Sequence, residues 1–150
     1  MGRDSKPPRR AALSTADYQR LASFRHALRR FLHFSESETA RVGLTGQQYQ
    51  VMIVLRSRGG RAPVTIGDLA REMYVRHHSA VGLVDRLVAQ GLLARARVPD
   101  DRRKVRLQLT AAGERVLARL ASVHRKKLRR IGPDIHRILG EMTVAWRGGR

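Results

Sequence analysis

The sequence contains no cysteine among its 150 residues. This absence excludes disulfide bridges, zinc sites built on thiolates and the sensing of oxidants through a thiol. No apolar run approaches the roughly 20 residues that a membrane-spanning helix needs. The basic stretch MGRDSKPPRR at the amino terminus is not followed by a hydrophobic signal core. We therefore expect no export and a cytoplasmic protein.

Acidic residues are scarce, because 12 Asp and Glu stand against 31 Lys and Arg, and the formal net charge is +19. Such a charge attracts polyanions, so nucleic acid and anionic membranes are the two natural partners. Nearly all of the basic residues are arginine, and a general bias of composition toward arginine is the alternative explanation. A hydrophobic share of 42% argues against disorder, and the length suits one domain.

Enzyme motifs are also missing. The sequence has no phosphate-binding glycine loop, no Gly-x-Ser-x-Gly elbow and no His-Glu-x-x-His motif. The adjacent His77 and His78 would point about 100° apart on a helix, so they cannot easily share a metal ion. We therefore expect no enzymatic activity, no cofactor and no metal site.

Helical signals dominate the first part of the chain. A polar, basic arm over residues 1–14 precedes apolar residues at helical spacing, which predict a long amphipathic helix over 15–38. Thr45 with Gln48 forms a capping box that opens a helix to about Arg56, and residues 65–68 open a third helix in a similar way.

The next helix, over 77–90, has one apolar face and ends at Gly91. Two short helices joined by about three or four residues form a helix-turn-helix. Alternating apolar and polar residues then predict a hairpin over 93–109 with one buried face and a basic tip. Thr110 opens a long helix, which Gly132-Pro133 breaks or kinks, with Pro133 in the first turn of a last helix that runs to 146. Residues 147–150 form a tail.

This order predicts a mainly α fold with a small β-wing: a winged helix-turn-helix over 44–110 within a single domain over 15–146. An α-helix fits the major groove, and the second helix of the motif presents its amino-terminal residues to base edges. The candidate DNA-binding residues of this helix are Arg76, His77, His78, Ser79, Val81 and Gly82. Gly82 weakens the helix by about 1 kcal/mol, and either a close backbone approach to DNA or simple tolerance explains it.

Basic residues crowd the predicted wing. Its candidate DNA-binding residues are Arg95, Arg97, Arg102, Arg103 and Lys104. A polyanion would neutralise this concentrated charge, although a merely solvated surface is the alternative. An arginine at such a tip can enter the minor groove. Asp101 and Arg103 share a face of an extended segment and could pair, which would orient the wing.

Four segments together resemble the MarR family of transcriptional regulators: LTGQQYQVMIVL, TIGDLAREM, HHSAVGLVDRLVAQGLL and PDDRRKVRLQLTAAGERVL. The resemblance covers roughly Tyr18 to Met142. Its most specific piece is Asp101-x-Arg103 followed by Leu109-Thr110 and Ala112-Gly113.

The resemblance implies a homodimer whose dimerisation helices lie over 15–38 and 111–146. It implies binding to a pseudo-palindromic operator, with Arg103 reaching the minor groove and Asp101 holding the wing in shape. Many such regulators release DNA when they bind small phenolic or aromatic ligands, so a ligand of this class is a candidate partner. One departure is Arg76, which stands where relatives commonly have a capping Ser or Thr. Their base contacts therefore do not carry over position by position.

We thus expect a cytoplasmic, nucleoid-associated, homodimeric regulator that binds double-stranded DNA specifically, acting as a repressor. The alternative is an architectural protein that binds DNA without sequence preference, which the charge of +19 would also suit. A membrane partner is not expected, because the charge clusters on the wing rather than along an exposed amphipathic helix.

Overall fold

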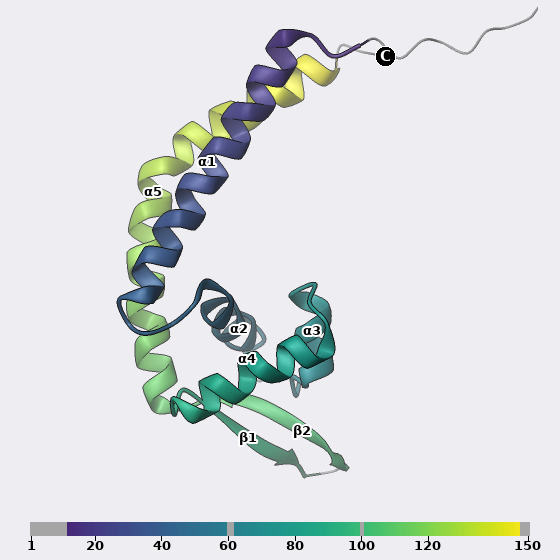
Figure 1. Cartoon of the computed structure of the whole chain (residues 1–150), viewed down its shortest axis with the longest axis vertical. Helices are drawn as coiled ribbons and strands as arrows, with labels where there is room; N and C mark the ends of the chain where they lie inside the picture. Colours follow the sequence, from purple (N-terminus) through teal and green to yellow (C-terminus); the bar gives the residue numbers. More distant parts are fainter. Residues whose placement is uncertain (1–11, 60–61, 100, 148–150) are drawn as a thin grey trace, which may run out of the picture. The chain divides into compact units, whose positions relative to one another are not determined.

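The computed structural model describes the backbone of residues 12–59, 62–99 and 101–147, and the side chains of these residues except 102, 103 and 147 (Figure 1). The predicted arm and tail therefore lie largely outside the described residues. The elements follow in the order α1 (Thr15–Ala40), α2 (Gly46–Ser57), α3 (Ile66–Glu72), α4 (His77–Ala89), β1 (Leu93–Val98), β2 (Asp101–Leu109) and α5 (Ala111–Arg147). The predicted mainly α fold with a β-wing is confirmed.

The chain divides into two compact units. The central unit comprises His33–Lys127, and the terminal unit comprises Met1–Leu32 with Leu128–Arg150. Helices α1 and α5 each contribute residues to both units. No helix in the described part of the chain combines the length and the apolar character that crossing a membrane would need.

The core of the central unit joins α2, α3, α4 and the hairpin. Its fully buried large side chains come from three helices and are Val51, Met52, Leu69, Val84 and Leu87. Helix α4 packs on α2, α3 and β1, and β1 pairs with β2 in an antiparallel hairpin. The amide of Leu107 in β2 also donates to the carbonyl of Val64 at 2.9 Å, which attaches the hairpin to the segment before α3.

The hairpin buries one face only near its base. In β2, Leu107 is buried and Leu109 is partly buried, as the alternation predicted. In β1 the prediction is wrong, because the buried residue is Leu93, whereas the alternating Ala94 pairs with Gln108 on the opposite face. Val105, on the same predicted face, is 38% exposed. The prediction of a buried face is therefore wrong at Val105, because the distal half of the hairpin extends beyond the helices that cover its base.

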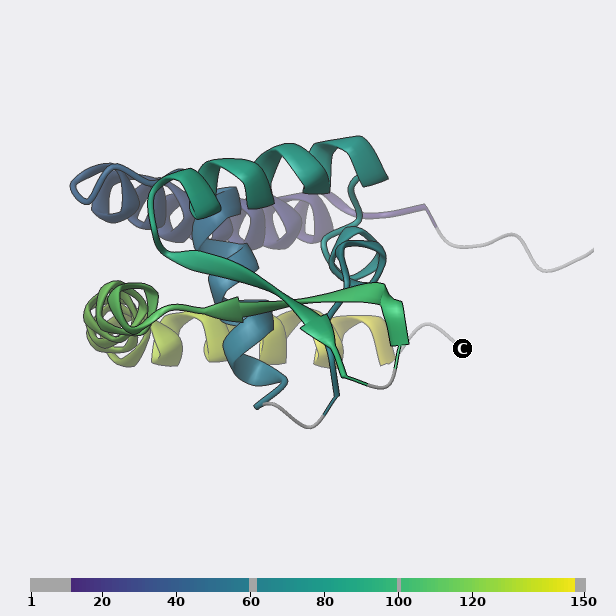
Figure 2. The same cartoon turned by 90° about the horizontal axis from the view of Figure 1, so that it is seen from below.

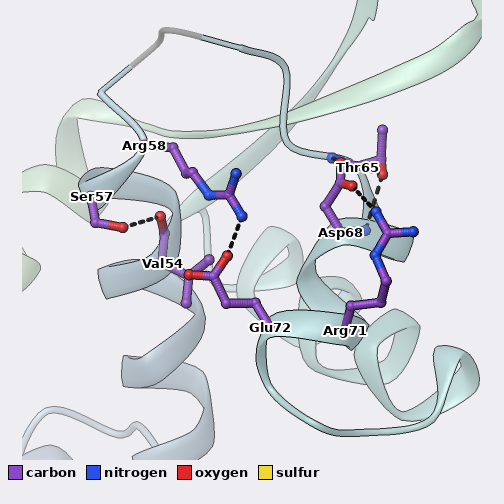
Figure 3. A network of polar contacts seen from close by, with 7 residues as sticks. All are labelled: Val54, Ser57, Arg58, Thr65, Asp68, Arg71 and Glu72. Carbon is purple, nitrogen blue, oxygen red and sulfur yellow. Dashed lines mark hydrogen bonds and ion pairs between the residues drawn. The ribbon is translucent and has the colours of Figure 1, made fainter.

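Both predicted capping signals form. Thr45 Oγ1 accepts from the amide of Gln48 at 3.2 Å, and the Gln48 side chain accepts from the amide of Thr45 at 2.8 Å. Thr65 and Asp68 repeat this arrangement at α3 (Figure 3). The two boxes satisfy amides that a helix leaves without intrahelical partners, and they fix where each helix begins.

Two ion pairs involve residues of α3. Arg58, which follows α2, pairs with Glu72 at the end of α3, and Arg71 pairs with Asp68 (Figure 3). These pairs are exposed and each adds little stability. The pair of Arg58 with Glu72 nevertheless links the end of α2 to α3, the first helix of the helix-turn-helix, whereas the pair of Arg71 with Asp68 lies within α3.

Replacing Asp68 by alanine is expected to lower the free energy of unfolding by about 1 kcal/mol at neutral pH, since the α3 cap is lost. The hydrogen bond from the Thr65 amide, followed by that from the Thr65 hydroxyl, lowers the pKa of Asp68 from its ordinary value of 3.8. A lowered folded-state pKa stabilises the fold above pH 3.8, and the contribution disappears as the pH falls through the folded-state value. Urea unfolding of both proteins across acidic pH measures the difference.

Gln48 supplies a matched control, because it occupies the same capping position in α2 with a side chain that does not titrate. The difference in the free energy of unfolding between Gln48→Ala and the unmodified chain should therefore stay the same as the pH falls through this acidic range. A difference for Asp68→Ala that persists at pH values well below 3.8 would contradict the role of its carboxylate.

A buried histidine anchors α5 within the central unit. The His124 Nδ1 atom lies 2.7 Å from the carbonyl oxygen of Leu120, which can only accept, so this nitrogen carries a proton. Its Nε2 atom lies 2.8 Å from the Ser35 hydroxyl, and its ring stacks on Tyr49 with centroids 4.6 Å apart. Burial raises the pKa of Tyr49, which keeps its phenol neutral. The cluster joins the end of α1 and helix α2 to α5.

Of the two alternatives predicted at Gly132-Pro133, a break or a kink, the break is wrong, and no new helix begins at Pro133. Helix α5 runs without interruption from Ala111 to Arg147, with Pro133 inside it. Proline removes one amide donor and crowds the carbonyl four residues earlier. A helix can still continue past a proline when the residues on both sides favour helix. Apolar residues keep helical spacing on both sides of Pro133, and this pattern favours one helix.

Candidate nucleic-acid interface

Helix α4 divides its side chains between the core and the surface. Its buried residues are Ala80, Leu83, Val84 and Leu87. The predicted DNA-binding residues lie on the other side: Arg76, His77, His78 and Ser79 are exposed, and Val81 and Gly82 are partly exposed. The structure therefore brings these six residues together at one end of one helix, available to an external partner.

The amino terminus of α4 is open. Arg76 holds the N-cap position with an extended backbone, and its carbonyl accepts the amide of Ser79 at 3.0 Å. No described side chain caps this end, whereas side chains cap both α2 and α3. Amides in the first turn of a helix have no intrahelical acceptor, and the helix dipole favours an anion there. A phosphate oxygen suits this position.

The hairpin contains a bulge in its basic part. Arg97 pairs with Val105, but the next pair is Val98 with Asp101, so residues 102–104 of β2 have no partner in β1. A bulge bends its strand and redirects the side chains on it. The ammonium of Lys104 lies 3.6 Å from a carboxylate oxygen of Asp101, across the bulge. The side chains of Arg102 and Arg103 lie outside the described residues, so the predicted pairing of Asp101 with Arg103 stays a prediction.

The predicted wing residues differ in their surroundings. The guanidinium of Arg95 pairs with Asp85 on α4, which links β1 to α4. Arg97 and Lys104 are exposed in the distal half of the hairpin. Arg95 thus has a role in holding the wing against α4, whereas Arg97 and Lys104 present their charges to solvent.

The two parts of the interface face the same way. In both views of the central unit, the amino end of α4 and the distal end of the hairpin lie on the same side (Figures 1 and 2). One polyanion could therefore meet the open helix end and the basic strands together. Sequence reasoning missed the pairing of Asp85 with Arg95, because no local signal relates residues of a helix and a strand that meet only in the fold.

Comparisons with known proteins agree with this geometry. The sequence model of the MarR family matches residues 42–104, which include the whole of α2, α3, α4 and β1. Over these residues the chain is similar to the MarR family. An uncharacterised helix-turn-helix transcriptional regulator of Bacillus subtilis, YsmB, is 35% identical over 66 residues, covering 44% of this chain and 45% of the relative. The chain spans about half the length of the curated relatives it matches.

Solved MarR-type structures share the fold over most of the chain. AbsC, a MarR-family transcriptional regulator from Streptomyces coelicolor, superposes with a TM-score of 0.70 at 20% identity, over 92% of this chain and 99% of that one. MepR of S. aureus in complex with DNA superposes with a TM-score of 0.64 at 14% identity, over 82% of this chain and 93% of that one. These likenesses show the winged-helix fold.

The segment after the wing explains part of the MarR-family pattern in this chain. The Thr110 hydroxyl donates to the carbonyl of Gly91 at 2.6 Å and accepts the amide of Gly113 at 3.0 Å. A Cβ atom on Gly113 would lie 2.1 Å from the carbonyl oxygen of Leu92. Thr110 and Gly113 therefore hold the start of α5 close to the turn between α4 and β1, where the hairpin begins.

Proposed function

We propose that the chain is a homodimeric transcriptional regulator that binds double-stranded DNA in a sequence-specific way and acts as a repressor. The observation that carries this proposal is the uncapped, exposed amino end of α4 on the same side as the basic end of the hairpin. Such an arrangement favours a mode of binding in which the helix reads bases in the major groove and the wing contacts the sugar–phosphate backbone of the DNA.

Charge supports a DNA partner. The net charge is +19, and the wing carries exposed basic side chains at Arg97 and Lys104. Each phosphate that a protein neutralises changes the slope of log K against log salt by about −0.9. We therefore propose a strongly salt-dependent affinity, with Asp101 and Arg103 shaping the wing as the sequence predicts.

The first experiment is selection of bound fragments from the genome of the source organism, with competition by unrelated DNA at physiological salt. A regulator enriches a small set of related, pseudo-palindromic sites. An architectural protein, the second candidate function, retains no preference, and the charge of +19 is the observation in its favour.

Replacing Ser79 by alanine should weaken binding to the selected site by about 1–3 kcal/mol, as for a lost base contact, and leave binding to unrelated DNA nearly unchanged. Fluorescence anisotropy with both duplexes measures the two affinities. Ser37→Ala is the matched control, because the hydroxyl of the exposed Ser37 only bonds to the carbonyl of His33 in its own helix. Equal losses on both duplexes would assign Ser79 to a phosphate instead of a base.

Association of two copies is proposed from the apolar surface of the terminal unit. Its exposed large apolar side chains are Leu13, Tyr18, Leu28, Leu32, Leu128, Leu139, Val144 and Trp146. In the described central unit, only Tyr74 and Val105 are comparable. Large exposed apolar patches mark sites of association. A second copy of the chain would cover them, and a dimer would place two α4 helices on the two halves of a symmetric operator.

Regulation by a small aromatic or phenolic ligand, and a cytoplasmic, nucleoid-associated location, complete the proposal. Both rest on the similarity of residues 42–104 to the MarR family. Titrating the DNA complex with a panel of phenols and aromatic acids tests the first, since a ligand that favours the free protein must release DNA.

A further inference from the structure

Helices α1 and α4 end with the same backbone device. At the end of α1, Gly43 has φ +75° and Leu44 donates its amide back to the carbonyl of Thr39. At the end of α4, Gly91 has φ +70° and the next amide bonds back to Leu87 in the same way. This is the Schellman motif, in which one residue adopts the left-handed conformation. Glycine suits that position because it has no Cβ atom.

Helix α3 ends with this device too, but the left-handed residue is Tyr74. Its φ is +54°, its amide donates to the carbonyl of Arg71 at 3.2 Å, and the amide of Val75 donates to Ala70 at 3.0 Å. Among the described residues, Tyr74 is the one non-glycine residue with a positive φ. A bulky residue is strained in this conformation, because its Cβ atom approaches a carbonyl oxygen. The fold alone therefore favours glycine here, as in the two other motifs.

Packing against the described residues does not offset this strain. The side chain of Tyr74 is 97% exposed, so its ring adds almost no buried area to the fold. Strained residues are found preferentially at functional sites, where a contact outside the fold retains them. An exposed tyrosine offers both a flat apolar ring and a hydroxyl that can donate a hydrogen bond.

The position of Tyr74 identifies the contact. It lies in the turn of the helix-turn-helix, two residues before the N-cap Arg76 and beside the exposed first turn of α4. When the recognition helix enters the major groove, the other parts of a helix-turn-helix cross the sugar–phosphate backbone. Tyrosine hydroxyls are regular donors to phosphate oxygens.

We propose that Tyr74 contacts the DNA backbone at the edge of the major groove, with its hydroxyl donating to a phosphate oxygen and its ring lying against the adjoining sugar. The inference rests on the proposed DNA-binding function and adds a residue to it. The strained turn thus places a phosphate contact at a fixed distance from the base-reading residues of α4.

Three variants of the full chain test this contact. Tyr74→Phe keeps the ring and removes the hydroxyl, so it should weaken binding about 5- to 10-fold on both the selected site and an unrelated duplex, since a phosphate contact carries no sequence information. Tyr74→Ala and Tyr74→Gly should bind at least as weakly. Tyr74→Gly should nevertheless melt about 3 °C above Tyr74→Ala, because only glycine relieves the left-handed strain.

Ser37→Ala is the control, because it removes another exposed hydroxyl, which bonds to the carbonyl of His33 in its own helix α1, and should leave DNA binding unchanged. Unaltered affinity of Tyr74→Phe and Tyr74→Gly would overturn the contact. A loss confined to the selected site would also overturn it, because it would indicate a base instead of a phosphate. In either case the unmodified chain would still enrich its site, whereas failure of that enrichment would overturn the proposed function itself.

Discussion

Gly113→Ala is expected to lower the free energy of unfolding by about 3 kcal/mol, at the upper end for overpacking a buried position. The new Cβ atom would lie 2.1 Å from the carbonyl oxygen of Leu92 and 3.2 Å from a methyl carbon of Leu109. The Leu92 carbonyl cannot move aside freely, because it is backbone and accepts the amide of Thr110 at 3.1 Å. Equilibrium unfolding in urea, followed by circular dichroism, measures the change.

Gly82→Ala is the matched control and should have the opposite sign. Gly82 lies inside α4, and no described atom would come within 4 Å of its Cβ, so alanine should stabilise the helix by about 1 kcal/mol. If Gly113→Ala is as stable as the unmodified chain, the close approach to Leu92 is incorrect. The DNA affinity of Gly82→Ala also separates the two explanations of that glycine: a loss indicates close approach of DNA, and no change indicates tolerance.

Replacing Leu28 and Leu32 together by aspartate should convert the proposed dimer to a folded monomer and weaken binding to the selected DNA site by about 10²–10⁴-fold. The two residues lie one turn apart on α1, and both are exposed in the single chain. Buried, unpaired carboxylates would oppose association by several kcal/mol. A monomer then loses the gain that comes from linking two half-site contacts. Analytical ultracentrifugation and anisotropy measure the two effects.

The control replaces the same two leucines by methionine, which keeps apolar character and volume and should preserve the dimer. Because Leu28 and Leu32 are exposed, the aspartate variant should keep the helical circular dichroism of the folded chain. An aspartate variant that sediments as a dimer would show that this face of α1 does not hold two copies together.

Local signals predicted much of the fold. Thr45 and Gln48 form a complete capping box at the first turn of one helix, and Gly91 ends α4 with a positive φ. In each case the partners lie within five residues, so the sequence alone determines the contact. The candidate residues of α4 were predictable for the same reason, since helical periodicity fixes which side of the helix is apolar.

Other features depend on contacts between distant segments, or on competition between residues that favour a helix and residues that end one. The pairing of Arg95 with Asp85 requires the packing of β1 on α4, and the bulge at 102–104 requires the register of two strands. Pro133 misled the sequence analysis because proline commonly ends a helix, while regular helix on both sides carries α5 through it. The left-handed conformation of Tyr74 could not be predicted from the sequence, because glycine usually marks such a position and none stands there.

The outer strand edges of the distal half of the hairpin, beyond the bridge between Leu107 and Val64, have a consequence for solubility. A two-stranded sheet exposes backbone donors and acceptors that can pair with another sheet, and β-rich edges aggregate by this route. In this chain Arg97 on β1 and Lys104 on β2 are exposed, and a bulge interrupts β2 beside Lys104. Like charges and an irregular strand both hinder edge-to-edge pairing. The basic residues that suit the hairpin to a polyanion thus also keep free hairpins from joining one another, and this protection weakens as salt screens their repulsion.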